Sequence, residues 1–184
     1  DPAPPSIDPA VSEPPITGRC FLDFSIDGSP AGRVVVSLYG TVAPATCANF
    51  AALARGASGY GYAGTSVYRV VQGLTVQMGD VVRDDGTAGK SATGQPLPPE
   101  TYAVMHSLPG VVSMVAGPGG AADSRFLVAT RGEGSGYLDG RYVAFGRVTE
   151  GMDVVRRIEA LPTSGTRNRP RARCVIEAAG VLDE

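Results

Sequence analysis

Hydrophobic and polar residues alternate along most of this chain, which is the pattern of strands with one buried face. Runs of this kind, separated by turn residues, occupy residues 20–26, 33–39, 65–71, 74–81, 111–115, 126–130, 142–148 and 174–182. No internal repeat accompanies them. The pattern predicts an all-β fold, a closed eight-stranded antiparallel barrel.

Two further segments have the periodicity of helices. The first begins at Pro44 and stops at Gly56, because proline suits the first turn of a helix and glycine the position after the last. The second covers residues 150–161, and its apolar stripe consists of Met152, Val155, Ile158 and Leu161. We expect these two α-helices to cap the two ends of the barrel.

Residues 1–17 have a different composition. They hold six of the fifteen prolines of the chain, and all their charged residues are acidic. Such a segment can neither form a helix nor pair fully in a sheet. We therefore expect an extended, solvated tail, separate from a barrel domain of residues 18–184. Removal of the tail should leave the melting temperature of the barrel unchanged. Two roles stay open, a spacer left by cleavage of a targeting segment or an arm that docks onto a protein complex.

The composition is that of one soluble globular domain, with 184 residues, 43% of them hydrophobic and 18% charged. A net charge of −2 gives no electrostatic reason to expect nucleic acid or an anionic membrane as a partner. No apolar run approaches the ~18 residues of a membrane span. Cys20, Cys47 and Cys174 are too few for a disulfide framework or a zinc site. We expect buried thiols, with a Cys20–Cys174 bridge as the alternative.

The most informative segment, residues 66–81, reads SVYRVVQGLTVQMGDV. It sets Arg69 inside an apolar strand and Gln77 in the next one, which ends at Gly79 and Asp80. No nucleophile, carboxylate pair or metal ligand accompanies them. A cationic donor on an apolar surface suits a reaction that needs a hydrogen bond and dry surroundings, not covalent chemistry. The ordinary alternative is a solvated arginine at a sheet edge.

Two other segments also combine a turn with a following strand, LPGVVSM at residues 108–114 and YLDGRYVAFG at residues 137–146. In this order and spacing, residues 19–184 resemble the cyclophilins, the barrel-type peptidyl-prolyl cis–trans isomerases. The signature F-H-R-x-I-x-G-F-x-x-Q-x-G-D of that family corresponds to residues 67–80. The resemblance implies an isomerase, or rotamase, that acts on proline-containing polypeptides in protein folding and needs neither cofactor nor metal.

Residues 19–26 resemble plastid members of the family, particularly those of the chloroplast thylakoid lumen. The chain begins at Asp1 without a methionine, which we interpret as removal of a targeting segment or as trimming. A secretory or periplasmic compartment stays open.

The resemblance also assigns roles to single residues. Arg69 is the catalytic guanidinium, which donates a hydrogen bond to the prolyl nitrogen as the peptide bond twists. Gln77 either holds Arg69 or binds the substrate backbone. The other implied substrate-binding positions are Leu74, Thr75, Val115, Ala116, Arg125, Phe126, Leu127, Tyr137, Leu138 and Tyr142.

Several of these positions depart from the family pattern. Leu74 and Leu127 replace phenylalanines, and Tyr137 replaces a tryptophan, so the surface for a proline ring has less aromatic area. Arg125 replaces a glutamine and adds a second positive charge near the groove. Further differences fall at Thr75, Val115, Ala116 and Tyr142. We expect reduced or narrow isomerase activity and weak binding of cyclosporin-type ligands, with a catalytically inactive binding or assembly module as the alternative.

Three other motifs indicate no further chemistry. The G-x-G-x-x-G of residues 59–64 follows a helix and precedes a strand, the reverse of a dinucleotide-binding turn. The Gly-Lys-Ser of residues 89–91 lacks the leading glycine and the following helix of a phosphate loop. His106 is the single histidine, so a histidine-rich metal site is excluded, and no G-x-S-x-G elbow accompanies it. We expect a structural role for His106.

Overall fold

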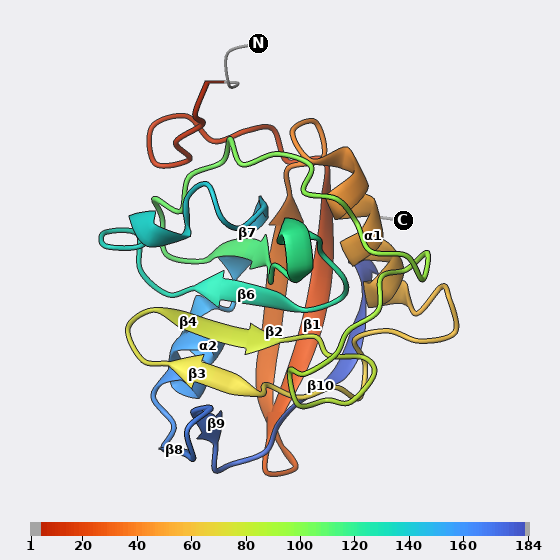
Figure 1. Ribbon diagram of the computed structural model, residues 1–184. Helices are drawn as coiled ribbons and strands as arrows, with labels where there is room; N and C mark the ends of the chain where they lie inside the picture. The colour runs from red at the N-terminus through yellow and green to blue at the C-terminus, as the bar shows by residue number, and fades with distance from the viewer. Residues whose placement is uncertain (1–4, 183–184) are drawn as a thin grey trace.

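The computed structural model of the chain describes residues 5–182. Its main sheet is antiparallel and has eight strands, in the order β10-β1-β2-β7-β5-β6-β4-β3. The strands are β1 (Gly18–Ile26), β2 (Ser29–Leu38), β3 (Arg69–Val71), β4 (Thr75–Met78), β5 (Val111–Met114), β6 (Phe126–Ala129), β7 (Ala144–Glu150) and β10 (Cys174–Leu182). The sheet curls so strongly that β1 and β2 run steeply across the direction of β3 and β4 (Figure 1). The predicted strands therefore all occur.

The sheet is a curled half-barrel, and the prediction that it closes is wrong. Its edge strands, β3 and β10, share no ladder. The segment just before β3 contacts β10 instead, through the isolated bridge between Ser66 and Val175 and neighbouring backbone hydrogen bonds such as Val67 N–H to the Cys174 carbonyl at 2.9 Å. Since β3 begins only at Arg69, too little extended chain remains to complete the ladder along β10.

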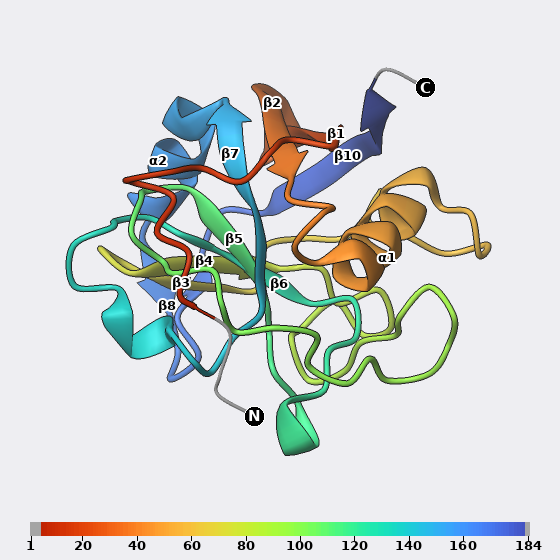
Figure 2. The ribbon, with the colours of Figure 1, turned by 90° about the horizontal axis from the view of Figure 1, so that it is seen from above.

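Two helices lie well apart along the curled sheet (Figures 1 and 2) and pack against the same core. Helix α1 (Pro44–Arg55) has its proline in the first turn and ends at Gly56, whose φ of 70° is left-handed, as the sequence predicts. Helix α2 (Met152–Glu159) buries Val154, Val155 and Ile158. Met152 and Leu161, the outer members of the predicted stripe, pack partly buried against the same core.

Three short elements were not predicted. A hairpin of β8 (Thr163–Ser164) and β9 (Arg169–Pro170) forms a separate two-stranded sheet. Two 3-10 turns, η1 (Pro118–Gly120) and η2 (Gly136–Leu138), precede β6 and β7. All are too short to show hydrophobic periodicity. None of the helices among the described residues is both long and apolar enough to cross a membrane.

The three cysteines are free thiols in the buried interior. The alternative of a Cys20–Cys174 bridge is wrong, because Cys20 pairs with Val181 and Cys174 pairs with Ile26 at opposite ends of the β1–β10 ladder. Burial raises the pKa of the Cys20 thiol to about 12. It does the same for Cys47. These thiols are therefore core residues, as the sequence predicts.

Residues 5–17 form a strap that packs against the sheet, so the prediction of a solvated tail is wrong for this part of the chain. The Ile7 N–H donates to the Ala103 carbonyl at 2.7 Å, and the Met105 N–H donates to the Ile7 carbonyl at 2.8 Å. Pro9 and Pro14 are buried. The extended segment around Ala103 offers unpaired backbone groups, and the strap satisfies them. Residues 1–4 of the predicted tail lie outside the described residues.

Candidate active site

A row of side chains crosses the outer face of the sheet. Arg69 on β3 pairs with Gln77 on β4, Gln77 pairs with Leu127 on β6, and Leu127 pairs with Ser113 on β5. Directly opposite residues in an antiparallel sheet have Cβ atoms about 4.5–5.5 Å apart. On each strand, the sequence neighbours of these residues point to the other face, into the core: Val70, Val76, Val112, Phe126 and Val128. The pairing thus places the predicted arginine and glutamine beside an apolar surface.

Phe126 does not belong to this row, and its prediction as a substrate-binding residue is wrong. Its ring lies in the core, with centroids 5.1 Å from Phe50 and 5.0 Å from Tyr62. Phe126 and Leu127 are neighbours in one strand, so their side chains must face opposite sides of the sheet. Only Leu127 faces the candidate site.

Arg69 is exposed at the edge of the sheet. Within residues 5–182 its guanidinium makes no hydrogen bond or ion pair, so its donors face the groove unused. Gln77 does not hold it. The Gln77 amide donates instead to the hydroxyl of Thr75, a buried residue on the same strand, at 3.4 Å. Of the two roles predicted for Gln77, the geometry supports contact with a substrate backbone.

A pocket of about 380 Å³ opens beside Arg69. Its walls come from the strands, from the loop after β4 and from the β8–β9 hairpin: Tyr68, Arg69, Gln77, Asp85, Gly86, Thr87, Val115, Thr166 and Arg167. Ala116, predicted to bind substrate, is half-buried beyond the end of β5 and does not line it. A larger pocket of about 530 Å³ lies between α1 and the ends of β1 and β10, and it contains none of these residues.

The sequence did not identify the loop and hairpin residues of this pocket. Both segments are irregular and polar, so no periodicity marks which of their side chains turn inward. The one signal in the sequence is the glycine at position 86, since glycine in an irregular segment is typical of a turn or a close approach of the backbone. Its φ is 86°, and a Cβ there would lie 2.5 Å from the Tyr68 ring, so the position requires glycine.

An apolar cluster adjoins the row on the side of β6. Leu127, Ala129 and Leu138 form its buried centre, and Val115 and Tyr142 pack on it half-buried. Leu127 and Leu138 are each only 2% exposed. This is where the resemblance places the proline ring, so the site is dry but offers little open apolar surface.

The rim of the apolar cluster is set by the turn η2 and by the turn after β3. Within η2, Leu138 points into the cluster while Tyr137 stays 47% exposed. Leu74 is half-buried at the start of β4. Burial raises the pKa of the Tyr137 hydroxyl, whereas the positive charges of Arg131 and Arg69 act to lower it. Tyr137 therefore lies within electrostatic reach of the candidate catalytic arginine.

Asp80 organises the loop that forms one wall of the pocket. The side chain is fully buried, and its carboxylate accepts hydrogen bonds from five backbone N–H groups at 2.8–3.3 Å. The donors belong to Val82, Arg83, Asp85, Gly86 and Ala88. Burial acts to raise the pKa of Asp80, but the N–H donors outweigh it and hold the pKa below its usual value. The loop is thus fixed by a buried anion.

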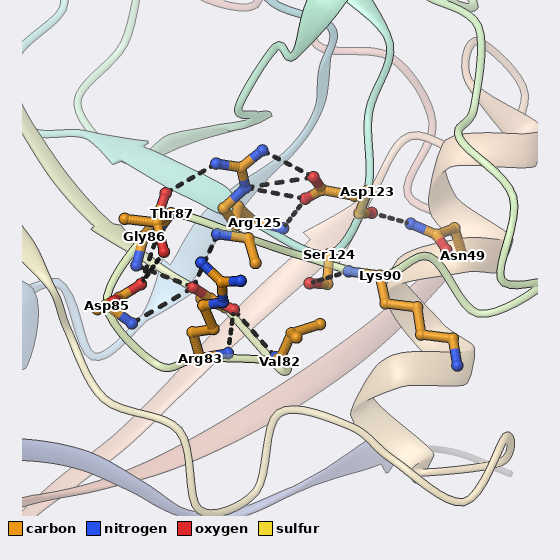
Figure 3. Close-up of polar contacts among 12 residues, drawn as sticks. Asn49, Val82, Arg83, Asp85, Gly86, Thr87, Lys90, Asp123, Ser124 and Arg125 are labelled. Atoms are coloured by element: carbon orange, nitrogen blue, oxygen red, sulfur yellow. Dashed lines mark hydrogen bonds and ion pairs between the residues drawn. The ribbon is translucent and has the colours of Figure 1, made fainter.

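Arg125 ties the same loop to β6 (Figure 3). Its guanidinium pairs with Asp123 at 2.8 Å and donates to the Gly86 carbonyl at 2.8 Å. The second positive charge that the sequence predicts near the groove is therefore not free to meet a substrate. Asp123, two residues earlier in the same turn, neutralises the guanidinium, which acts as a brace across the pocket wall.

His106 joins the rim to the sheet beneath the apolar cluster. Its Nδ1 lies 2.8 Å from Asp139, the residue that follows η2, and its Nε2 bonds the Ser113 hydroxyl. Burial lowers the pKa of His106, and the opposing effect of Asp139 does not overcome it. Ser113 is fully buried and cannot meet a substrate. The three residues form a structural link, as predicted for His106, and not a nucleophilic triad.

The match to a known family covers most of the chain. Residues 21–181 match the family described as cyclophilin type peptidyl-prolyl cis-trans isomerase/CLD. This span contains the whole row from Arg69 to Ser113, the apolar cluster and the pocket walls. No group of three or more histidine, cysteine or acidic side chains that could hold a metal occurs among the described residues. The chain belongs to the cyclophilin-type peptidyl-prolyl cis–trans isomerase family.

Proposed function

We propose that this protein accelerates the cis–trans isomerisation of X–Pro bonds in polypeptides, with Arg69 as its catalytic residue. Family membership supports the class of reaction. The observation that carries the assignment is an exposed guanidinium, with no partner within residues 5–182, in register with Gln77 and next to the apolar cluster. The chemistry needs no covalent intermediate.

The barrier to rotation is ~18–20 kcal/mol because resonance gives the amide C–N bond partial double-bond character. Twisting the bond breaks this resonance and leaves a lone pair on the prolyl nitrogen. A guanidinium aimed at that nitrogen gains a hydrogen bond only in the twisted state, so it lowers the barrier by differential binding. The apolar cluster holds the ring and excludes water, which strengthens the hydrogen bond. Gln77 binds the backbone of the same peptide.

Two substitutions of Arg69 test this proposal. Arg69→Ala should lower kcat/KM by at least ~10-fold, which corresponds to about 1.4 kcal/mol. Arg69→Lys keeps the charge but loses the planar set of donors, so its activity should lie between that of the unmodified protein and that of Arg69→Ala. Because Arg69 is exposed, both variants should melt at the temperature of the unmodified protein. Unchanged activity of the alanine variant would show that the donor is another group.

A binding or assembly module is the second candidate, because the small exposure of the apolar cluster limits how firmly a proline ring can be held while its bond rotates. Leu127 and Leu138 present almost no surface to a proline ring. On this alternative, peptides bind elsewhere in the groove, through residues such as Gln77 that line the pocket, and the cis and trans forms of their X–Pro bonds exchange no faster. Magnetisation-exchange NMR on a proline peptide measures both quantities in one sample, so it separates the two candidates.

We also propose the thylakoid lumen as the compartment. The proposal rests on the resemblance of residues 19–26 to plastid members of the family. Fractionation of chloroplasts, with detection of the protein in stroma, membrane and lumen, tests it. Recovery from a secretory or periplasmic fraction of the source cell would contradict it.

A further inference from the structure

The hairpin beside the pocket is locally basic. Between Glu159 and Glu177 the chain carries four arginines and no acidic residue, although the net charge of the whole chain is −2. The arginines are Arg167, Arg169, Arg171 and Arg173. Thr166 and Arg167 line the same pocket as Arg69. A concentrated positive charge therefore borders the candidate active site.

The position of this hairpin is fixed by its contacts with the strand that bears Arg69. The Val70 N–H donates to the Asn168 carbonyl at 2.9 Å. Arg169 donates to the Asp84 carbonyl and to the Ser66 hydroxyl, both at 3.1 Å. These bonds hold Asn168 and Arg169, the two residues that follow Arg167, against the sheet and the loop after β4. Arg167 is itself exposed, and its guanidinium makes no hydrogen bond or ion pair within residues 5–182.

The charges around the pocket divide between its two sides. Arg69 and Arg167 line it with no ion-pair partner among the described residues, while Arg125 is neutralised by Asp123. The one carboxylate that lines the pocket belongs to Asp85, which lies on the loop wall and accepts the Thr87 N–H at 2.9 Å. The hairpin side is therefore net positive, and the loop side is negative.

We propose that Arg167 determines substrate specificity and favours X–Pro peptides that carry Asp or Glu next to the proline on the hairpin side. The inference rests on the proposed function for the position of the peptide. A guanidinium binds a carboxylate with two parallel hydrogen bonds, which a lysine or glutamine side chain of the peptide cannot accept in that form. The pair is solvent-exposed, so the preference for an acidic over a basic peptide is about 5-fold.

Six blocked peptides with one X–Pro core test the inference. Three carry Glu, Gln or Lys before the core, and three carry the same residues after it. Exchange NMR gives kcat and KM for each at low salt and at 0.5 M salt, where exposed charges are screened. The Glu peptide should be preferred over the Lys peptide by about 5-fold, mainly through KM, in one of the two placements. High salt should reduce this ratio. Arg167→Gln should bring it close to one.

Arg157→Gln is the matched control. It removes the same charge from an exposed position on α2 and does not line the pocket, so it should leave activity and the Glu-to-Lys ratio unchanged. A ratio that persists in Arg167→Gln, or falls equally in Arg157→Gln, overturns the inference. If no peptide is isomerised, NMR titration of the same peptides decides. Tighter binding of the Glu peptide, lost in Arg167→Gln, supports the inference while the proposed function fails. Equal binding, or none, overturns the inference.

Discussion

Glu13 should stabilise the folded protein although it lies on the strap, outside the span that matches the family. Its carboxylate accepts the Tyr39 hydroxyl at 2.8 Å and pairs with Arg147 through two hydrogen bonds of 2.8 and 3.1 Å. Tyr39 is fully buried, whereas the Arg147 and Glu13 side chains are 27% and 29% exposed. Glu13→Ala would leave the Tyr39 hydroxyl buried without this acceptor.

The two contacts of Glu13 set the expected magnitude. A buried hydroxyl that loses its partner costs about 1–3 kcal/mol. The partly exposed ion pair with Arg147 adds ~0.5–1 kcal/mol. We therefore expect Glu13→Ala to lower the free energy of unfolding by about 2 kcal/mol, which lowers the melting temperature of a domain of this size by roughly 4–8 °C.

Urea denaturation of a double-mutant cycle with Tyr39→Phe measures this effect. In the phenylalanine background no hydroxyl is left unsatisfied, so Glu13→Ala should cost only the ion pair. The coupling energy should be ~1–2 kcal/mol. A loss below ~0.5 kcal/mol in Glu13→Ala, or an equal loss in both backgrounds, would refute the reasoning.

The pH dependence gives an independent check on Glu13. The hydrogen bonds from Arg147 hold the pKa of the Glu13 carboxyl below its ordinary value of 4.5. The unfolded state then takes up the proton first as the pH falls. The stabilisation by Glu13 is therefore complete above pH 4.5 and is lost as the pH falls through the lower pKa of the folded state. Glu13→Gln should remove this part of the acid transition.

Three further outcomes follow from the site. Asp80→Asn replaces a buried acceptor of five N–H bonds by an amide that also carries donors, so urea denaturation should show a loss of ~2–4 kcal/mol. Burial lowers the pKa of His106 below 6.5, so the unfolded state binds the proton first and the free energy of unfolding should fall as the pH drops below 6.5. Thermal melts at several pH values should show this effect in the unmodified protein and not in His106→Gln. Because Leu74 and Tyr137 reduce the aromatic surface, calorimetry should show weaker binding of cyclosporin-type ligands than in a family member with the full aromatic set, and equally tight binding would contradict this.

The alternation of the sequence located the strands because it records which face of each strand is buried. It could not set where β4 stops. The prediction extends β4 to residue 81, but Gly79 has a left-handed φ of 96°, and a Cβ there would lie 2.7 Å from the Ser124 carbonyl oxygen. That constraint comes from a distant segment of the chain. The sequence shows only a glycine, which many strands tolerate.

Closure of the sheet and docking of the strap depend on backbone hydrogen bonds, which have no signature in side chains. The bonds of Ile7 with Ala103 and Met105 would form with almost any residue at position 7. Composition alone predicted a solvated tail, because proline-rich segments bury little surface. The buried Pro9 and Pro14 show that a proline-rich segment can pack when unpaired backbone groups lie within its reach.

The candidate site divides into parts that sequence can and cannot identify. Arg69 stood out because a charged residue in an apolar strand contradicts its surroundings. Arg125 was noted because it replaces a glutamine of the family pattern, but its effect depends on Asp123 and on the Gly86 carbonyl, which only the fold brings together. A charge on a surface is a ligand for a substrate only when the protein has not already neutralised it.

The rebuilt surface around Leu127 bears on binding more than on the chemical step. Contacts with a proline ring form in the ground state and in the twisted state alike, so losing them raises KM with little effect on kcat. Arg69 acts only on the twisted state. The wall that faces it, held by Asp80 and braced by Arg125, keeps its geometry without help from the aromatic residues that the sequence has lost. The structure therefore separates a retained catalytic donor from a weakened binding surface.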